Sequence, residues 1–209
     1  MKFNFPEQIP IFPLSGVVYF PRTNLPLNIF EKRYIDLVND CVKRDKLMGM
    51  IQNKKDGNKV YNVGCLGKID DFKKNSDGRI FINLTGLTRF KVKKEIINNK
   101  LYREFAVEYK DFSSDVLNDY ESMKNIELSF VLKKIKTFFD KNNLLLNWKE
   151  FEKLDKEQQV NTLTMIAPIL NEEKQKLLES ITLNEKLQTL SKIVEFYLHE
   201  KNFEKETLQ

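Results

Sequence analysis

Three side chains in this sequence are of the types that most often carry nucleophilic or metal chemistry: Cys41, Cys65 and His199. Two cysteines and one histidine cannot complete the usual four-ligand structural zinc site unless a carboxylate joins them. A disulfide would need an oxidising compartment, and no secretory signal points to one. Cys41 falls on the apolar side of a helical pattern and Cys65 lies between glycines in a strand-like run. We therefore interpret both as small buried side chains.

The remaining polar candidates do not assemble into a catalytic set. His199 stands near the end of the last predicted helix, where a cation complements the helix dipole, so we expect a solvated position. Asp70 and Asp71 are adjacent in a predicted strand and point to opposite faces, so they cannot easily share a metal ion. The patterns G-x-x-x-x-G-K-[ST], G-x-G-x-x-G and G-x-S-x-G are all absent. We expect no catalytic residue, no metal site and no cofactor.

The charge of the 209-residue chain is uneven. Residues 1–112 hold 21 Lys and Arg against 13 Asp and Glu, whereas residues 113–209 hold 14 against 17. The simpler interpretation is a lysine-rich solvated surface. The alternative is a basic face that attracts nucleic acid or acidic partners, for which Lys91, Lys93 and Lys94 are the best candidates.

No segment of the sequence is typical of a leader or a membrane span. The first residues lack an apolar stretch followed by a small-residue cleavage site. The longest uncharged runs, residues 8–21 and 158–171, are 14 residues each and too short to cross a bilayer. We expect a cytoplasmic protein with no membrane partner.

The elements that position these residues differ between the two halves. Residues 9–20 are apolar and broken by prolines, which favours short strands at a sheet edge. A helix is predicted from Glu31 to about Lys46, because apolar residues recur at helical spacing: Tyr34, Leu37, Val38, Cys41 and Val42. Strands are predicted at 47–52, 60–72 and 101–110, with Asp77-Gly78 as a hairpin turn and Gly64 and Gly67 allowing a bulge or close backbone contact. Residues 79–97 alternate, with Ile80, Ile82 and Leu84 on one face and, after Gly86, a second strand through Phe90 and Val92.

The second half follows a helical period. A helix over residues 116–140 is predicted from one apolar stripe: Tyr120, Met123, Phe130, Val131, Ile135 and Phe138. Three more helices should start at caps, namely Asp155 with Gln158, Asn171, and Thr182 with Glu185. Short connections predict a bundle. The predicted class is α+β, with a bent antiparallel β-rich subdomain at 1–112 and a helical bundle at 113–209.

Several motifs together resemble one known family. The segment from Pro10 to Tyr34 resembles its "PLFPL", "V-x-F-P" and "LPL-x-IFE-x-RY" steps. Residues 63–69 and 77–92 resemble its "GC-x-G-x-I" strand and its "DGR…L-x-G-x-x-RF-x-V" hairpin, and residues 102–109 fit the strand that follows. Residues 171–194 resemble its "KQ-x-LLE…RL-x-x-L" end, with Lys186 where the family has arginine. On these motifs, residues 8–200 resemble the amino-terminal domain of Lon, the ATP-dependent protease.

The resemblance implies a PUA-like pseudo-barrel followed by a helical bundle. In the complete protease this domain selects and holds substrate polypeptides, while an ATPase module and a Ser–Lys peptidase act on them. The 209 residues contain neither module, so we expect a stand-alone, non-enzymatic form. It would hold unfolded or flexible polypeptides as an adaptor or holdase, and a separate ATPase or protease could be its partner.

The motif at residues 26–34 has a structural and a binding interpretation. Pro26 and its apolar neighbours would fix the corner between strand and helix, and Glu31 with Arg33 would stabilise it through backbone hydrogen bonds or an ion pair. Alternatively, the rim of the motif lines an apolar groove for protein segments, with these candidate residues: Tyr19, Phe20, Arg22, Leu25, Phe30 and Arg33. Two other hypotheses stay open, which are nucleic-acid binding by the basic half and a small-molecule enzyme in a cleft between the halves.

Overall fold

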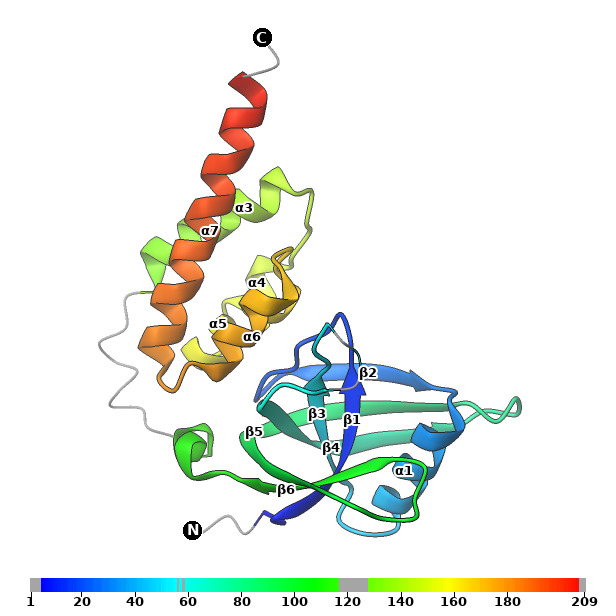
Figure 1. Cartoon of the computed structure of the whole chain (residues 1–209). Coiled ribbons are helices and arrows are strands. Elements are labelled where there is room, and N and C mark those ends of the chain that lie inside the picture. The colour runs from blue at the N-terminus through cyan, green and yellow to red at the C-terminus, as the bar shows by residue number, and fades with distance from the viewer. Residues whose placement is uncertain (1–4, 56, 58, 117–127, 207–209) are drawn as a thin grey trace. The chain divides into compact units, whose positions relative to one another are not determined.

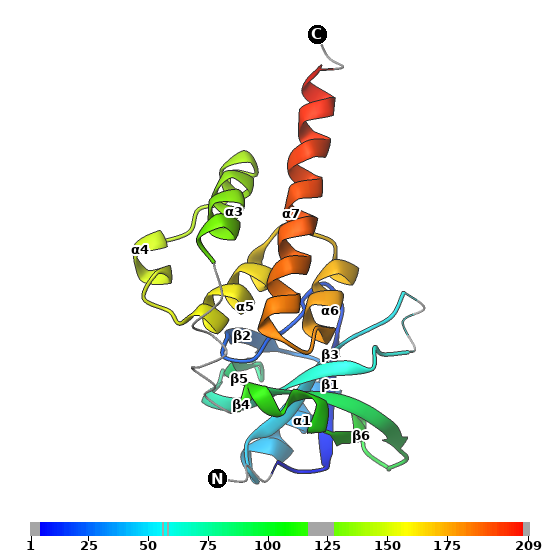
Figure 2. The same cartoon turned by 90° about the vertical axis from the view of Figure 1, so that its left-hand side faces the viewer.

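The computed structural model describes residues 5–55, 57, 59–116 and 128–206, which belong to two compact units divided between residues 118 and 119 (Figures 1 and 2). The first unit holds the strands, helix α1 and the 3-10 helix η1, and the second holds helices α3 to α7. Because η1 (Lys110–Asp115) belongs to the strand-rich unit, that unit extends beyond residue 112, the limit predicted from the sequence.

The first unit is one curled sheet of six strands: β1 (Gln8–Leu14), β2 (Asn24–Ile29), β3 (Leu47–Gln52), β4 (Val63–Lys74), β5 (Ile80–Ile96) and β6 (Arg103–Glu108). The order is β2-β5-β4-β3-β1-β6, and β6 also pairs with β5, so the sheet returns on itself as an incomplete ring. Strand β5 is continuous through Gly86, so the separate second strand predicted after that residue was wrong. It pairs with β2 over residues 80–85 and with β6 over 91–96. The described pairings are antiparallel except that of β1 with β3. The predicted bent, mostly antiparallel β half is confirmed.

Strand β1 is internal, so the prediction of a sheet-edge position was wrong. It changes partner halfway, pairing with β6 over residues 8–11 and with β3 over 11–14. A hydrogen bond from Val107 N to Glu7 O directs the odd-numbered residues toward β6, and the even-numbered ones therefore face β3. Pro10 faces β3 before that pairing begins, and Pro13 faces β6 after that pairing has ended. Both prolines thus fit inside the sheet without removing a ladder hydrogen bond.

The interior of the ring is a small apolar cluster made of Ile9, Ile11, Ile51, Leu66, Phe90, Phe105 and Val107. Gly64 and Gly49 leave the space that the Phe90 ring occupies. A Cβ on Gly64 would lie 2.5 Å from both the Phe90 ring and Met50 O, and a Cβ on Gly49 would meet Ile11 and Phe90. Of the two outcomes predicted for Gly64 and Gly67, Gly67 shows a bulge, as a register shift between Leu66 and Gly67, and Gly64 shows a close backbone contact, with Met50 O.

Helix α1 (Lys32–Val42) packs outside the ring, against β1 and β3. Its buried stripe is Tyr34, Leu37, Val38 and Cys41, as the sequence predicts. The ring of Tyr34 stacks on Phe12 of β1 with centroids 3.9 Å apart. The helix ends at Val42, four residues before the predicted limit.

A buried ion pair attaches η1 to the ring. Arg89 Nη2 donates to Asp115 Oδ1 at 2.7 Å, and Arg89 Nε and backbone N both donate to Asp115 Oδ2, at 2.9 and 2.8 Å. The two side chains are only 3% and 1% exposed. The guanidinium also lies 4.4 Å from the centre of the Phe112 ring. Because both charges are buried, the loss of either side chain would leave the other charge buried without a compensating partner.

The second unit contains α3 (Ser129–Lys141), α4 (Trp148–Phe151), α5 (Lys156–Ile166), α6 (Asn171–Glu179) and α7 (Leu183–Glu206). Helices α3, α5 and α6 all contact α7 (Figures 1 and 2). Lys186, the residue that departs from the family pattern, is buried and donates to Asn161 Oδ1 at 2.7 Å. It therefore joins α7 to α5 inside the bundle.

Local signals predicted most helix starts correctly. Asp155 with Gln158 and Thr182 with Glu185 both form reciprocal capping hydrogen bonds. The cap of α6 is Leu170 rather than Asn171, because Leu170 N donates to Glu173 Oε2 at 2.9 Å. In the predicted stripe over 116–140, Phe130 is exposed while Val131, Ile135 and Phe138 are buried. Tyr120 and Met123 lie outside the described residues.

Gly64→Ala should lower the free energy of unfolding by about 1–3 kcal/mol, because the added methyl group overlaps Phe90 and the Met50 carbonyl. Urea unfolding followed by circular dichroism measures the change. The matched control is Gly78→Asn, which adds a side chain in open space at a left-handed position that asparagine tolerates. Equal stabilities for Gly64→Ala and the parent protein would contradict the packing described for the ring.

Asp115→Ala should cost about 3–5 kcal/mol of unfolding free energy, because it removes the carboxylate that compensates the buried Arg89. Asp36→Ala, which breaks the exposed Lys32–Asp36 pair, should change it by less than about 1 kcal/mol. The same unfolding experiment measures both. A loss no larger for Asp115→Ala than for Asp36→Ala would show that η1 is not held by this pair.

Candidate functional site

Two of the six candidate residues lie in the core. Tyr19 is 3% exposed and Phe20 is 0% exposed. The Tyr19 hydroxyl donates to Leu84 O at 2.8 Å, and its burial raises the phenol pKa. Both side chains are buried and offer no surface to a ligand, so the structure corrects their assignment to the rim of a groove.

Arg22 and Leu25 are partly buried. Arg22 has a φ of +60°, and its backbone N donates to Gly86 O at 2.9 Å. Leu25 lies opposite Leu84 in the β2–β5 pair, on the inward side of these strands. Both residues therefore help to position the start of β2 rather than to line an open groove.

The corner after β2 is formed by Glu31 and Arg33. The Glu31 carbonyl accepts from Tyr34 N and Ile35 N, each at 2.9 Å, and so starts α1. Arg33 Nη2 lies 2.7 Å from Glu31 Oε2, which confirms the predicted ion pair. The arginine also lies over the Tyr34 ring, at 4.5 Å. Pro26 is in the middle of β2, so the prediction that it fixes the corner was wrong.

The outward face of β2 and β5 carries two exposed aromatic rings. Leu25, Leu27 and Ile29 oppose Leu84, Ile82 and Ile80 on the inward side. Alternation therefore places Pro26, Asn28 and Phe81 outward, and Phe30 continues that side just after β2. Phe30 is 65% exposed and Phe81 is 44% exposed. We name this surface, made of Pro26, Asn28, Phe30 and Phe81, the β2–β5 face.

Sequence reasoning found Phe30 but missed Phe81. The signal was present, because Ile80, Ile82 and Leu84 were already placed on one side of their strand. The intervening Phe81 is then an aromatic residue on a side otherwise made of Asn83 and Thr85. Lys73 lies directly opposite Phe81 on β4 and is exposed, so the β2–β5 face has an adjacent cation.

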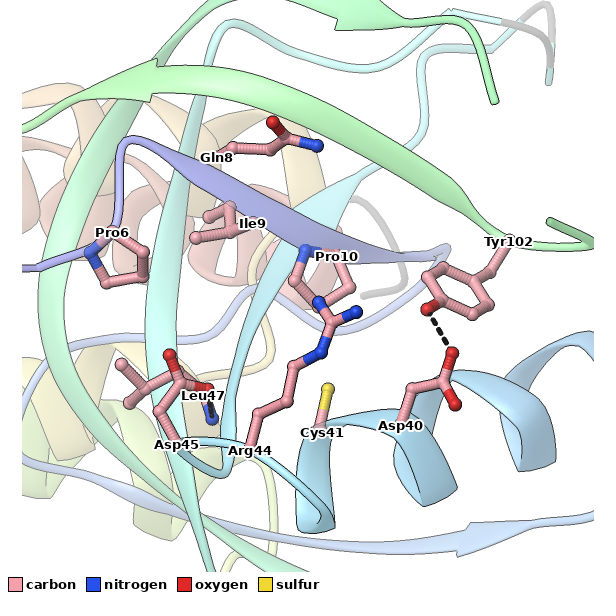
Figure 3. Close-up of a pocket in the computed structure, with 10 residues that line it drawn as sticks. All are labelled: Pro6, Gln8, Ile9, Pro10, Asp40, Cys41, Arg44, Asp45, Leu47 and Tyr102. Carbon is pink, nitrogen blue, oxygen red and sulfur yellow. Dashed lines mark hydrogen bonds between the residues drawn. The ribbon is translucent and has the colours of Figure 1, made fainter. Parts of the chain in front are cut away.

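A narrow pocket of about 40 Å³ lies between α1 and the start of β1, and Figure 3 shows its lining side chains. Tyr102 donates to Asp40 Oδ2 at 2.7 Å, and burial raises the Tyr102 pKa to about 12. Cys41 points toward this space, and burial, reinforced by Asp45 and Asp40, raises its thiol pKa to about 12. A space of this size holds water and no larger substrate, and the protonated thiol is a poor nucleophile.

The basic cluster on β5 is largely neutralised. Lys91 Nζ lies 3.5 Å from Asp111 and Lys93 Nζ lies 3.3 Å from Glu108. A register shift between Val92 and Lys94 also interrupts the regular alternation of the strand at these lysines. Two of the three lysines are thus paired with carboxylates, which does not favour the nucleic-acid hypothesis.

Residues 8–195 match the family described as the ATP-dependent protease La (LON) substrate-binding domain. The chain belongs to this family. The relatives include the Lon proteases of Syntrophus aciditrophicus, 27% identical over 94% of this chain and 26% of its own length, and of Dictyoglomus thermophilum, 25% identical over 90% and 24%. The chain therefore spans about a quarter of the Lon proteases that it matches, and the family match covers only the substrate-binding domain.

Two solved structures share the fold. A Lon N-terminal domain protein from Xanthomonas campestris matches with a TM-score of 0.66 and 21% identity, over 88% of this chain and 96% of that one. The N-terminal domain of the Mycobacterium avium complex Lon protease also matches with a TM-score of 0.66, at 12% identity, over 90% and 98%. The strand-rich and helical units together thus correspond to a Lon N-terminal domain.

Two general findings bear on the other classes of site. Within the described ranges, no group of three or more His, Cys, Asp or Glu side chains is arranged to hold a metal ion. In the same part of the chain, no helix is long and apolar enough to span a membrane.

Both cysteines should resist Ellman's reagent in the native protein at pH 8. Cys41 and Cys65 are buried, and the Cys41 thiol, with its raised pKa, stays protonated until the pH approaches 12. The absorbance of the thionitrobenzoate that the reagent releases should rise only after denaturant is added. The control is Ser76→Cys, which places a thiol at an exposed turn position and should react at once. Native thiols that react as fast as this control would refute the burial described here.

Proposed function

We propose that this domain binds exposed apolar segments of unfolded or flexible polypeptides and performs no chemistry on them. The observation that carries the proposal is the pair of exposed rings, Phe30 and Phe81, on the β2–β5 face of a Lon substrate-binding domain. Exposed aromatic side chains with a charged border are typical of protein-binding surfaces.

The site would therefore differ from the groove expected from the sequence. Phe30 remains a candidate contact residue, and Phe81 and Pro26 join it. Leu25 and Arg22 lie at the edge of the surface, while Arg33 is engaged with Glu31 and Tyr34 and would contribute at most a peripheral contact. Tyr19 and Phe20 would act only by holding β5 in place.

Binding through so few side chains should be weak and broad. Two partly exposed rings can bury a limited apolar area, and Lys73 adds one cation that would favour acidic residues next to the bound apolar segment. Such a surface suits an adaptor or holdase role. An ATPase and a peptidase, in this polypeptide or in another, would then act on the bound segment.

Phe30→Ser and Phe81→Ser should each weaken binding to a permanently unfolded, carboxymethylated protein by about fivefold or more, which corresponds to about 1 kcal/mol of lost apolar contact. Titration by fluorescence anisotropy at two salt concentrations measures the Kd. Because the contacts are apolar, the Kd should change little between the two.

The matched control is Phe72→Ser. Phe72 is 42% exposed, close to Phe81, but it opposes Ile82 and so lies on the other side of the same hairpin. Its removal should leave the Kd within twofold, provided that circular dichroism shows a folded protein. Equal losses for Phe72→Ser and Phe81→Ser, or no loss for any variant, would reject the β2–β5 face as the binding surface.

A further inference from the structure

Strand β2 ends the sheet and has an open edge. It pairs with β5 through all six of its residues, and no other described strand pairs with it. An open edge is a template on which an extended polypeptide can add a further strand by backbone hydrogen bonds. A domain that meets unfolded chains exposes this edge to many such segments, so the groups along it decide how those segments are held.

The hydrogen bonds at Gly86 fix which backbone groups face this edge. Gly86 N donates to Thr23 O, and Gly86 O accepts from Arg22 N, both at 2.9 Å. Alternation along β5 then directs Leu84, Ile82 and Ile80 toward β2. Their partners on β2 face back, so the backbone N and C=O groups of residues 24, 26 and 28 point to the open edge.

Pro26 occupies the central one of these three positions. It lacks an N–H, and its ring carbons stand where the carbonyl of an added strand would have to approach. The edge keeps only the separated donors of Asn24 and Asn28. An added strand would therefore leave its central carbonyl unpaired, which removes the advantage of pairing there.

We propose that Pro26 sets the mode of recognition, by blocking strand addition at β2 so that polypeptides are held only by side-chain contacts on the β2–β5 face. This inference rests on the proposed function and names how that same site selects its ligands: by apolar side chains rather than by strand-forming backbone. Contacts of this kind release quickly, whereas a strand added to the sheet would be held by several backbone bonds at once.

Pro26→Val tests the inference, since valine keeps an apolar outward side chain and restores the N–H. A soluble, strand-forming peptide of alternating threonine and valine serves as the probe. The variant should bind it about tenfold or more tightly than the parent protein, or should dimerise through paired β2 edges in analytical ultracentrifugation, because new backbone hydrogen bonds become available.

Asn24→Pro is the matched second variant, because it removes another donor of the same edge at a residue outside the β2–β5 face. Added to Pro26→Val, it should abolish the gain; alone, it should leave the affinity of the parent protein for the carboxymethylated protein unchanged. A folded Pro26→Val variant with neither tighter peptide binding nor dimerisation would overturn the inference, and so would a loss of affinity in Asn24→Pro alone. Failure of the parent protein to bind the carboxymethylated protein would instead reject the proposed function, since the peptide gain of Pro26→Val does not depend on it.

Discussion

One aromatic ring, that of Phe90, sets the dimensions of the strand ring. Its side chain fills the interior, and the backbones of β3 and β4 approach it only because residues 49 and 64 are glycines. The neighbouring Arg89 points to the opposite side, where Asp115 and Phe112 bind it. Two adjacent residues of β5 therefore have different roles. Phe90 packs inside the ring, and Arg89 attaches η1 to the outside of the ring.

The same long strand divides the first unit into a ring and an extension. Residues 91–96 of β5 complete the ring with β6, whereas residues 80–85 carry β2. The inward side of the extension is closed by Ile80, Ile82 and Leu84, with Tyr19 anchored to the Leu84 carbonyl. Among the described residues, the outward side carries exposed aromatic rings, of which Phe81 is one. The candidate surface exists because β5 continues past the ring that it helps to build.

Local features of the sequence correctly predicted those elements that depend on interactions between residues close in the chain. Helix α1, the caps at Asp155 and Thr182 and the β4–β5 hairpin all follow from side chains a few residues apart, and they are present. The errors concern distant partners. Tyr19 looked available because the Leu84 carbonyl that accepts its hydroxyl is 65 residues away. The prediction that β1 lies at a sheet edge was wrong because the composition of a strand does not indicate that it changes partner along its length. The outward position of Phe81, by contrast, could be predicted from strand alternation once its neighbours Ile80 and Ile82 had been placed inward.

The pairing of β1 with β6 also imposes an order on folding. Gln8 lies opposite Ala106, so the ring closes only when residues almost a hundred positions apart meet. During synthesis, β1 leaves the ribosome long before β6 exists, and contacts of such separation form slowly. In that interval the strand could pair with other nascent chains. Pro10 and Pro13 each remove one backbone N–H donor, on opposite edges of β1. The same prolines that fit inside the finished sheet therefore also disfavour pairing of β1 with other chains before β6 is made.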